Sequence, residues 1–278
     1  MSLCAFAHPR SLSALWLAPL GGALVSAAAT APAAAQTIMP HRAAYEASLN
    51  EEADNGPVED VAGRMVFEWQ DVCEGWTIAQ TYQLTLVYSG GNETDISSRY
   101  ATYESRDGTS FTYDMQDRRN GVTESHGRGS AELDGSPGAG RASMRLPEAG
   151  ELNLPPGTWF PTAHSLEILR RAEAGERIFT ATLFDGSAEI PLTEITTVIG
   201  TEIPADPEAE DPLRTGPSWP VVLAHFDPAT QDSEPLYEVS FVLFASGFVD
   251  HMVVNYGEFA IDLTAVASEP LPADCAED

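Results

Sequence analysis

The sequence predicts a mostly β protein: antiparallel hairpins that form a curved sheet, with one covering helix near residues 163–174. Three observations support this prediction. Long runs are rich in β-branched and aromatic residues and alternate between apolar and polar side chains. Short glycine-containing turn sequences separate these runs. Only one stretch carries apolar residues at helical spacing.

The first half of the chain contains four strand-like runs, at residues 61–69, 76–88, 93–103 and 109–115. In the second run, alternate positions from Trp76 to Tyr88 are almost all apolar, which is typical of a strand with one buried face. Turn signals follow at 89–91, 107–108, 120–121, 134–135 and 185–186. Such spacing favours consecutive hairpins over parallel crossovers.

The second half repeats this pattern, with strand-like runs at 178–184, 190–203, 220–226, 236–244, 248–256 and 259–266. The predicted helix, residues 163–174, lies between the two halves. Thr162 is a candidate N-cap, and Gly175 is a candidate C-terminal stop. In a mostly β chain, one such helix commonly covers the open end of a curved sheet. Residues 204–217 are acidic and proline-rich, which predicts an exposed loop.

The first 35 residues read as a secretory signal peptide. Arg10 supplies a basic start, residues 12–25 are largely apolar, and Ala33 to Ala35 form a small-residue cleavage site. The alternative is an N-terminal membrane anchor, but Pro19 and two glycines interrupt the apolar run. We expect cleavage near Ala35, location in the periplasm, and a mature chain of residues 36–278 with no transmembrane segment.

After cleavage only two cysteines remain, Cys73 and Cys275. In an oxidising compartment, two distant cysteines predict one long-range disulfide. A redox pair is the alternative, but redox cysteines are usually close in sequence. We therefore expect a structural disulfide.

The composition is strongly acidic, with 42 Asp and Glu against 14 basic residues, and every basic residue is arginine. A formal charge of −28 repels nucleic acid and anionic lipid headgroups, so binding to nucleic acid is excluded. The lack of lysine has two explanations that remain open: adaptation to salt, and a GC-rich genome that favours arginine codons.

The sequence offers no catalytic or metal-binding motif. The histidines at 41, 126, 164, 225 and 251 lack zinc-ligand spacing, and the acidic loop lacks the pattern of a calcium-binding loop. Gly127 to Ala131 is not a serine-nucleophile elbow, because Ser130 stands at the wrong position. We therefore expect no enzyme activity, no metal and no cofactor.

Several motifs together resemble those of the envelope integrity protein B (EipB) family of alphaproteobacterial periplasmic proteins. These motifs are residues 41–45 (HRAAY), 63–65 (GRM), 73–76 (CEGW), 105–108 (SRDG), 154–164 (LPPGTWFPTAH) and 183–186 (LFDG). The resemblance spans essentially the whole chain after residue 35. None of its motifs is catalytic.

This resemblance implies a single β-spiral, open barrel-like domain over residues 36–278, with a helix in its mouth and a Cys73–Cys275 disulfide. It also implies a role in envelope integrity without known enzymatic activity, through periplasmic protein partners or cell-wall components. An alternative comes from the similarity of the family's fold to the lipoprotein carriers LolA and LolB. In that case the concave sheet shelters an apolar ligand, such as a lipid or a lipoprotein acyl chain. The competing explanation is that the aromatic residues simply fill the core.

If a cleft exists, the residues around the helix start are expected to line it: Trp159, Phe160, His164 and Leu166. Arg42 and Arg64 are scarce cations in an acidic chain, and we expect them to pair with buried carboxylates.

Overall fold

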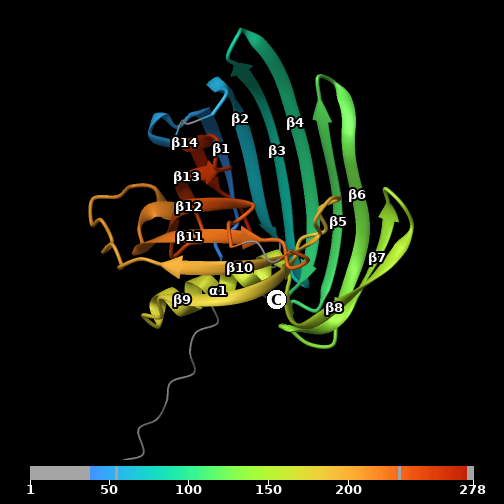
Figure 1. Cartoon of the computed structure of the whole chain (residues 1–278). Helices are drawn as coiled ribbons and strands as arrows, with labels where there is room; N and C mark the ends of the chain where they lie inside the picture. The colour runs from blue at the N-terminus through green and yellow to red at the C-terminus, as the bar shows by residue number, and fades with distance from the viewer. Residues whose placement is uncertain (1–37, 54–55, 231–232, 274–278) are drawn as a thin grey trace, which may run out of the picture. The chain divides into compact units, whose positions relative to one another are not determined.

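The computed structural model describes residues 38–53, 56–230 and 233–273, all of which belong to one compact unit, residues 36–278. The predicted signal peptide and Cys275 lie outside the described residues. Within them, fourteen strands form one closed barrel (Figure 1). The strands are β1 His41–Leu49, β2 Val58–Asp71, β3 Gly75–Tyr88, β4 Asn92–Ser105, β5 Ser110–Arg119, β6 Val122–Leu133, β7 Gly138–Leu146, β8 Gly150–Trp159, β9 Ile178–Phe184, β10 Leu192–Ile199, β11 Ser218–Phe226, β12 Tyr237–Phe244, β13 Val249–Asn255 and β14 Ala260–Pro270.

The prediction of a mostly β fold with antiparallel hairpins and one helix is confirmed, and the structure adds two features. The sheet closes, because β1 pairs with β14 as well as with β2. Closure leaves neither of these strands with an unpaired edge. In addition, β8 and β9 run parallel and pair at only two positions, Thr158 with Thr182 and Trp159 with Leu183.

Strand β8 includes Leu154 to Trp159, a segment that the sequence analysis did not identify as a strand. Two prolines occur there, and proline cannot donate a ladder hydrogen bond. The pairing of β7 with β8 is irregular at this place: Gly140 is opposite Leu154, and Gly138 is opposite Thr158. The prolines therefore occupy positions where the ladder is interrupted, which reconciles them with a strand.

The helix α1 spans Pro161–Glu173, and two short 3-10 helices, η1 Glu51–Ala53 and η2 Pro212–Arg214, lie in loops. The predicted stop at Gly175 is confirmed, since Gly175 has a φ of 74° and its N–H donates to Ala172. The predicted N-cap, Thr162, is wrong. The N-cap is Phe160, whose side chain makes no capping bond.

Glu104, near the end of β4, takes over the capping role. Its two carboxylate oxygens accept the N–H groups of Thr162 and Ala163, each at 2.7 Å. Helix α1 thus begins on a side chain from a strand far earlier in the chain.

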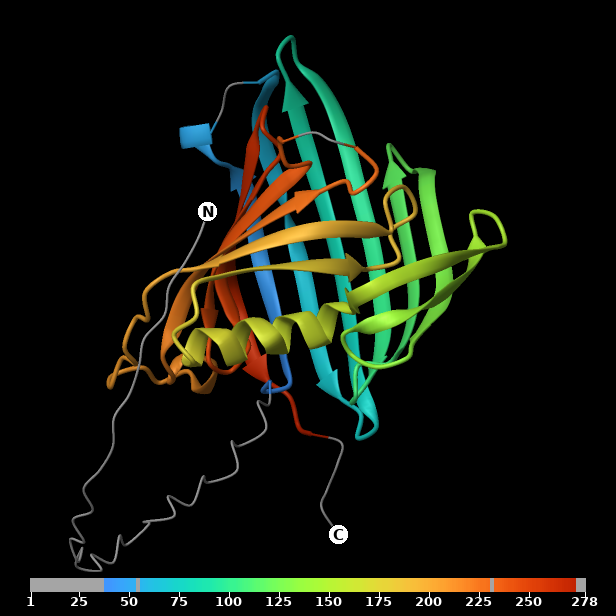
Figure 2. The ribbon, with the colours of Figure 1, turned by 60° about the horizontal axis from the view of Figure 1, so that its bottom comes forward.

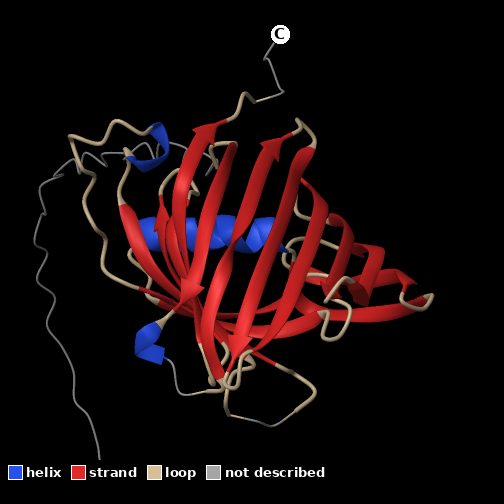
Figure 3. Cartoon of the chain, turned by 90° about the horizontal axis from the view of Figure 1, so that it is seen from above, coloured by secondary structure: helices blue, strands red, loops and turns tan. Residues whose placement is uncertain are grey.

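The helix α1 lies across the barrel between two of its walls (Figures 2 and 3). Its buried residues Ile168, Leu169 and Ala172 pack against Trp69 and Trp76 of one wall. The same cluster includes residues from β10, β11 and β12 on the other wall: Ile199, Trp219, Val221 and Leu243. Because α1 contacts both walls, it fills this part of the interior with apolar side chains.

Two further clusters complete the core. One gathers side chains of β1, β2, β13 and β14 around Tyr45 and Phe248, and the other surrounds Phe111, Phe160 and Phe184. In the described residues, no helix combines the length and apolar character needed to cross a bilayer.

Candidate binding groove on the outer face of the barrel

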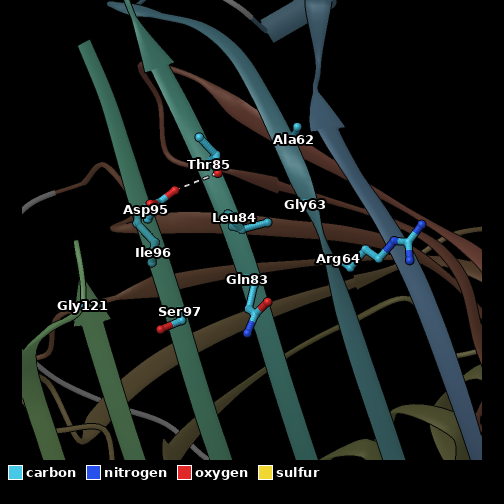
Figure 4. A pocket seen from close by; sticks show the side chains of 10 residues that line it. All are labelled: Ala62, Gly63, Arg64, Gln83, Leu84, Thr85, Asp95, Ile96, Ser97 and Gly121. Atoms are coloured by element: carbon cyan, nitrogen blue, oxygen red, sulfur yellow. Dashed lines mark hydrogen bonds between the residues drawn. The ribbon is translucent and has the colours of Figure 1, made fainter.

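A hollow of about 540 Å³ lies on the outer face of β2, β3 and β4 (Figure 4). It is lined by Ala62, Gly63, Arg64, Gln83, Leu84, Thr85, Asp95, Ile96, Ser97 and Gly121. We call this hollow the outer groove. Its volume falls within the range of about 300–1,000 Å³ that is usual for ligand sites.

The strand register arranges the polar lining in two rows. Arg64 pairs with Gln83, and Gln83 pairs with Ser97. Ala62 and Thr85 are paired, and Thr85 pairs with Asp95. These positions alternate along the strands with buried residues such as Val61, Met65 and Leu86, so their side chains face outward. Three long strands therefore hold amide, hydroxyl, carboxylate and guanidinium groups on one surface.

Asp95 is the most firmly held polar side chain of the outer groove. Its carboxylate accepts the Thr85 hydroxyl at 2.8 Å. Its backbone N–H donates to the side chain of Asn120 at 2.9 Å, and the Asn120 N–H returns a bond to the Asp95 carbonyl. The turn after β5 thus fixes one end of the groove.

The side chain of Arg64 is only weakly held by its neighbours. Its side chain is 78% exposed, and its one ion pair, with Glu46, has an N–O distance of 3.5 Å. Surface ion pairs of this kind contribute about 0–1 kcal/mol. Arg64 is therefore available to a ligand at little energetic cost.

The expectation that Arg42 and Arg64 pair with buried carboxylates is wrong. Arg42 lies at the surface and contacts Glu68 and Glu269 at 2.6 and 3.1 Å, and Arg64 contacts the exposed Glu46. The buried carboxylate is Glu104, and backbone N–H groups of α1 hold it in place of an arginine. Burial raises the pKa of Glu104 to about 7, and the bonds from Thr162 and Ala163 limit the rise.

A second hollow, of about 720 Å³, lies beside η1. Five carboxylates line it, from Glu51, Glu52, Glu59, Asp60 and Asp262. Across the described parts of the chain, no three His, Cys, Asp or Glu side chains are arranged to hold a metal ion.

The four residues predicted to line a cleft lie around the start of α1 and do not line either hollow. Phe160 is fully buried, with its ring centroid 5.0 Å from that of Phe111. Trp159 is half-buried at the end of β8, and Leu166 packs against the core from α1. His164 is buried beside Phe179, at 5.6 Å between rings. Their role in binding stays a prediction.

The predicted disulfide also stays a prediction. Cys73 lies in the turn between β2 and β3 with a φ of 68°, and Cys275 is outside the described residues. Sequence reasoning missed the outer groove except for Arg64, which it singled out as a scarce cation. The other lining residues are ordinary polar strand residues that only the register brings together.

Comparison with known proteins identifies the family and a similar fold. Residues 32–271 match the model of the EipB-like family. The chain is 30% identical over 243 residues to a Brucella abortus protein named Cell envelope integrity protein EipB, covering 84% of this chain and 85% of the relative. It is also similar to the crystal structure of a beta-barrel-like protein of domain of unknown function DUF1849 from Brucella abortus. That structure has a TM-score of 0.76 and 28% identity, and the match covers 86% of this chain and all of that one.

Proposed function

Because the chain belongs to the EipB-like family, we propose that it maintains cell envelope integrity by binding an envelope protein or a cell-wall component, without catalysing a reaction. The proposed location is the periplasm, after removal of the signal peptide near Ala35. The outer groove is the observation that carries the binding proposal. It offers a pre-formed hollow of ligand size on three long, mutually paired strands.

The chemistry of the outer groove favours a polar partner. Gln83 and Ser97 supply neutral donors and acceptors, while Arg64 and Asp95 supply one charge of each sign. The amide and hydroxyl groups of a glycan or a peptide can form hydrogen bonds with such a lining. These bonds replace those that the lining groups make to water.

Site-specific photo-crosslinking in cells tests the proposal. A photoreactive amino acid replaces Gln83 in the groove, and in a matched control it replaces Thr112, which is also exposed but lies on β5. We expect an adduct with one envelope protein or with cell-wall material at position 83 and none at position 112. Arg64→Ala in the same background is expected to weaken the adduct.

Equal adducts at both positions, or none at position 83, would contradict binding at the outer groove. A direct measurement completes the test: the purified protein is titrated with the crosslinked partner, and Arg64→Ala is compared with Arg141→Ala. Arg141 is exposed on β7 and lies outside the groove.

A second candidate function is a carrier for a lipid or a lipoprotein acyl chain, comparable to LolA and LolB. One observation favours it. Tyr82 and Leu84 of β3, and Met252 and Val254 of β13, pack against the core and still keep part of their surface exposed. Partly exposed apolar surface on the core side of the sheet suits an alkyl chain.

Native mass spectrometry of protein purified from periplasm tests the carrier function. Excess mass that disappears on denaturation identifies a bound ligand. A bare protein mass would count against the carrier and leave the outer groove as the binding site.

A further inference from the structure

Two histidines are buried in the interior of the barrel, one on α1 and one on its wall, and the charge of one acts on the other. His164 of α1 is 3% exposed and His225 of β11 is 7% exposed. The ring of His225 stacks on Tyr237 at 4.3 Å, and His164 lies beside Phe179. Among the residues that the structure describes, no carboxylate is bonded to the ring of either histidine, in contrast to His126 and His251, which contact Asp114 and Asp262.

Several buried polar atoms of the two histidines and of β10 lack a hydrogen-bond partner. Among the described residues, Nε2 of His164 and Nδ1 of His225 have no hydrogen-bond partner, nor do the hydroxyls of Thr193 and Thr197. Thr193 and Thr197 lie on the buried face of β10, and Ile195 between them pairs with His225. A buried polar atom without a partner costs about 1–3 kcal/mol, so this contact between α1 and the wall is already weak.

The barrel is also weakest beside α1. The helix connects β8 to β9, and these two strands pair at only two positions. In contrast, β3 pairs with β4 along all fourteen of its residues. Any change that releases α1 therefore acts on the one short, parallel junction of the sheet.

We infer that α1 is an acid-sensitive latch: protonation of His164 and His225 expels the helix from the interior and opens the barrel between β8 and β9. Protonation would place a positive charge on each of two buried side chains that act on one another electrostatically, and in the described parts of the chain no carboxylate is hydrogen-bonded to either ring. The expelled helix exposes both imidazoles to water. This inference does not depend on what binds the outer groove.

The charged groups around the latch fix the direction of its response. The pKa of His164 is lowered to about 4, mainly by burial; the charges of His225 and Arg171 act in the same direction, and Glu167 acts in the opposite direction. Burial alone lowers the pKa of His225 to about 4. Each histidine thus takes up a proton on opening as the pH falls below its ordinary pKa of 6.5.

The titration of Glu104 works against the proton uptake of the two histidines. Its pKa of about 7 in the closed state exceeds the ordinary value of 4.5, so release of the α1 N-terminus makes it lose a proton in the same pH range. On opening, the two histidines take up two protons and Glu104 loses one, which is a net uptake of one proton. Between about pH 6.5 and 4.5, opening is then expected to rise about tenfold per pH unit. His41 is buried as well, but it packs on Phe67 and Trp69 rather than on α1.

Hydrogen exchange of the purified protein, corrected for the intrinsic pH dependence of exchange, tests the latch. In the wild type, we expect exchange of α1 amides to rise about tenfold per pH unit over this range, while β3 and β4 stay protected. The variant E104Q removes the opposing proton, so the rise is expected to steepen to about a hundredfold per pH unit. The double variant H164Q/H225Q leaves only the proton lost by Glu104, so the rise is expected to reverse into a fall of about tenfold per pH unit as the pH decreases.

His126→Gln is the matched control, because His126 is partly exposed and faces Asp114; it is expected to leave the rise unchanged. A flat pH dependence at α1, or a rise shared equally by β3 and β4, would overturn the inference. If the double variant does not fold, imidazole NMR of the wild type decides. His164 and His225 must then titrate together with the loss of α1 protection, and separate midpoints overturn the latch.

Discussion

The carboxylate of Glu104 accepts the backbone N–H of Thr162 at 2.7 Å, across 58 positions of sequence. The acceptor comes from β4, and the donor lies in the first turn of α1. This bond, with its companion to Ala163, fixes where the helix starts and joins it to the long-stranded wall of the barrel. A buried acid here does the work that Ser, Thr, Asn or Asp at the N-cap does in most helices.

Replacing Glu104 by alanine is expected to lower the free energy of unfolding by about 2 kcal/mol, because two buried N–H groups lose their acceptor. Urea denaturation measures the change. The matched control is Glu124→Ala, since Glu124 is an exposed strand residue paired with Arg119, and it is expected to change stability by less than about 0.5 kcal/mol. Equal effects of the two variants would contradict the capping role.

The ionisation of Glu104 gives a pH dependence with a definite sign. Its pKa in the folded protein, about 7, lies above the ordinary 4.5, so its neutral form stabilises the fold. That contribution is complete below pH 4.5 and is lost as the pH rises through 7. The stability difference between wild type and E104Q should therefore fall by about 3 kcal/mol between pH 4.5 and 7.5. Urea titrations at several pH values measure it, and a constant difference would disprove the shift.

The aromatic cluster at the start of α1 is expected to be a major source of stability. Phe160 is fully buried against Phe111 and Phe184, with ring centroids 5.0 and 6.3 Å away. Phe160→Ala should cost about 3–5 kcal/mol, because it removes a large side chain from a packed core. Thermal unfolding measures this loss of stability. The control is Val122→Ala, a change at an exposed residue at the start of β6. A small cost would show that the cluster relaxes into the space.

The Cys73–Cys275 disulfide is open to a direct test. Mass measurement of the non-reduced protein should give a value two hydrogens lower than that of the reduced protein. A loop of about 200 residues predicts a loss of up to about 5 kcal/mol on reduction, if the chain-entropy model holds. Cys73→Ser should match the reduced protein in stability. A free thiol at Cys73 in protein from an oxidising compartment would exclude the bond.

The sequence was sufficient for ten of the fourteen strands and for the helix, but the strand-like runs did not include β1, β6, β7 or β8. Period-two alternation in residues 76–88 and the glycine turn at 89–91 identify β3 and its turn, since both signals are local. Gly175 marks the end of α1 for the same reason. Strand β8 was missed because its two prolines usually argue against a strand, and only the interrupted ladder beside β7 explains them.

The sites were harder to predict, because each depends on residues that are far apart in the chain. The Glu104 cap looks like an ordinary strand glutamate until β4 is placed next to α1. The outer groove depends on the register of three strands, which sets Arg64 beside Gln83 and Gln83 beside Ser97. A single sequence gives no measure of register between long strands with polar outer faces.

The pairing of β1 with β14 has a consequence for how the molecule assembles. Arg42 and its partner Glu269 are 227 positions apart, although almost every other strand pairs with its neighbour in the chain. As the chain folds, the successive hairpins can form locally, but β1 must wait for β14 and carries an unpaired edge until then. Such an edge is a template for association with other chains. A chaperone therefore gives the greatest protection before β14 pairs with β1 and closes the barrel. A chain truncated before β14 is expected to aggregate.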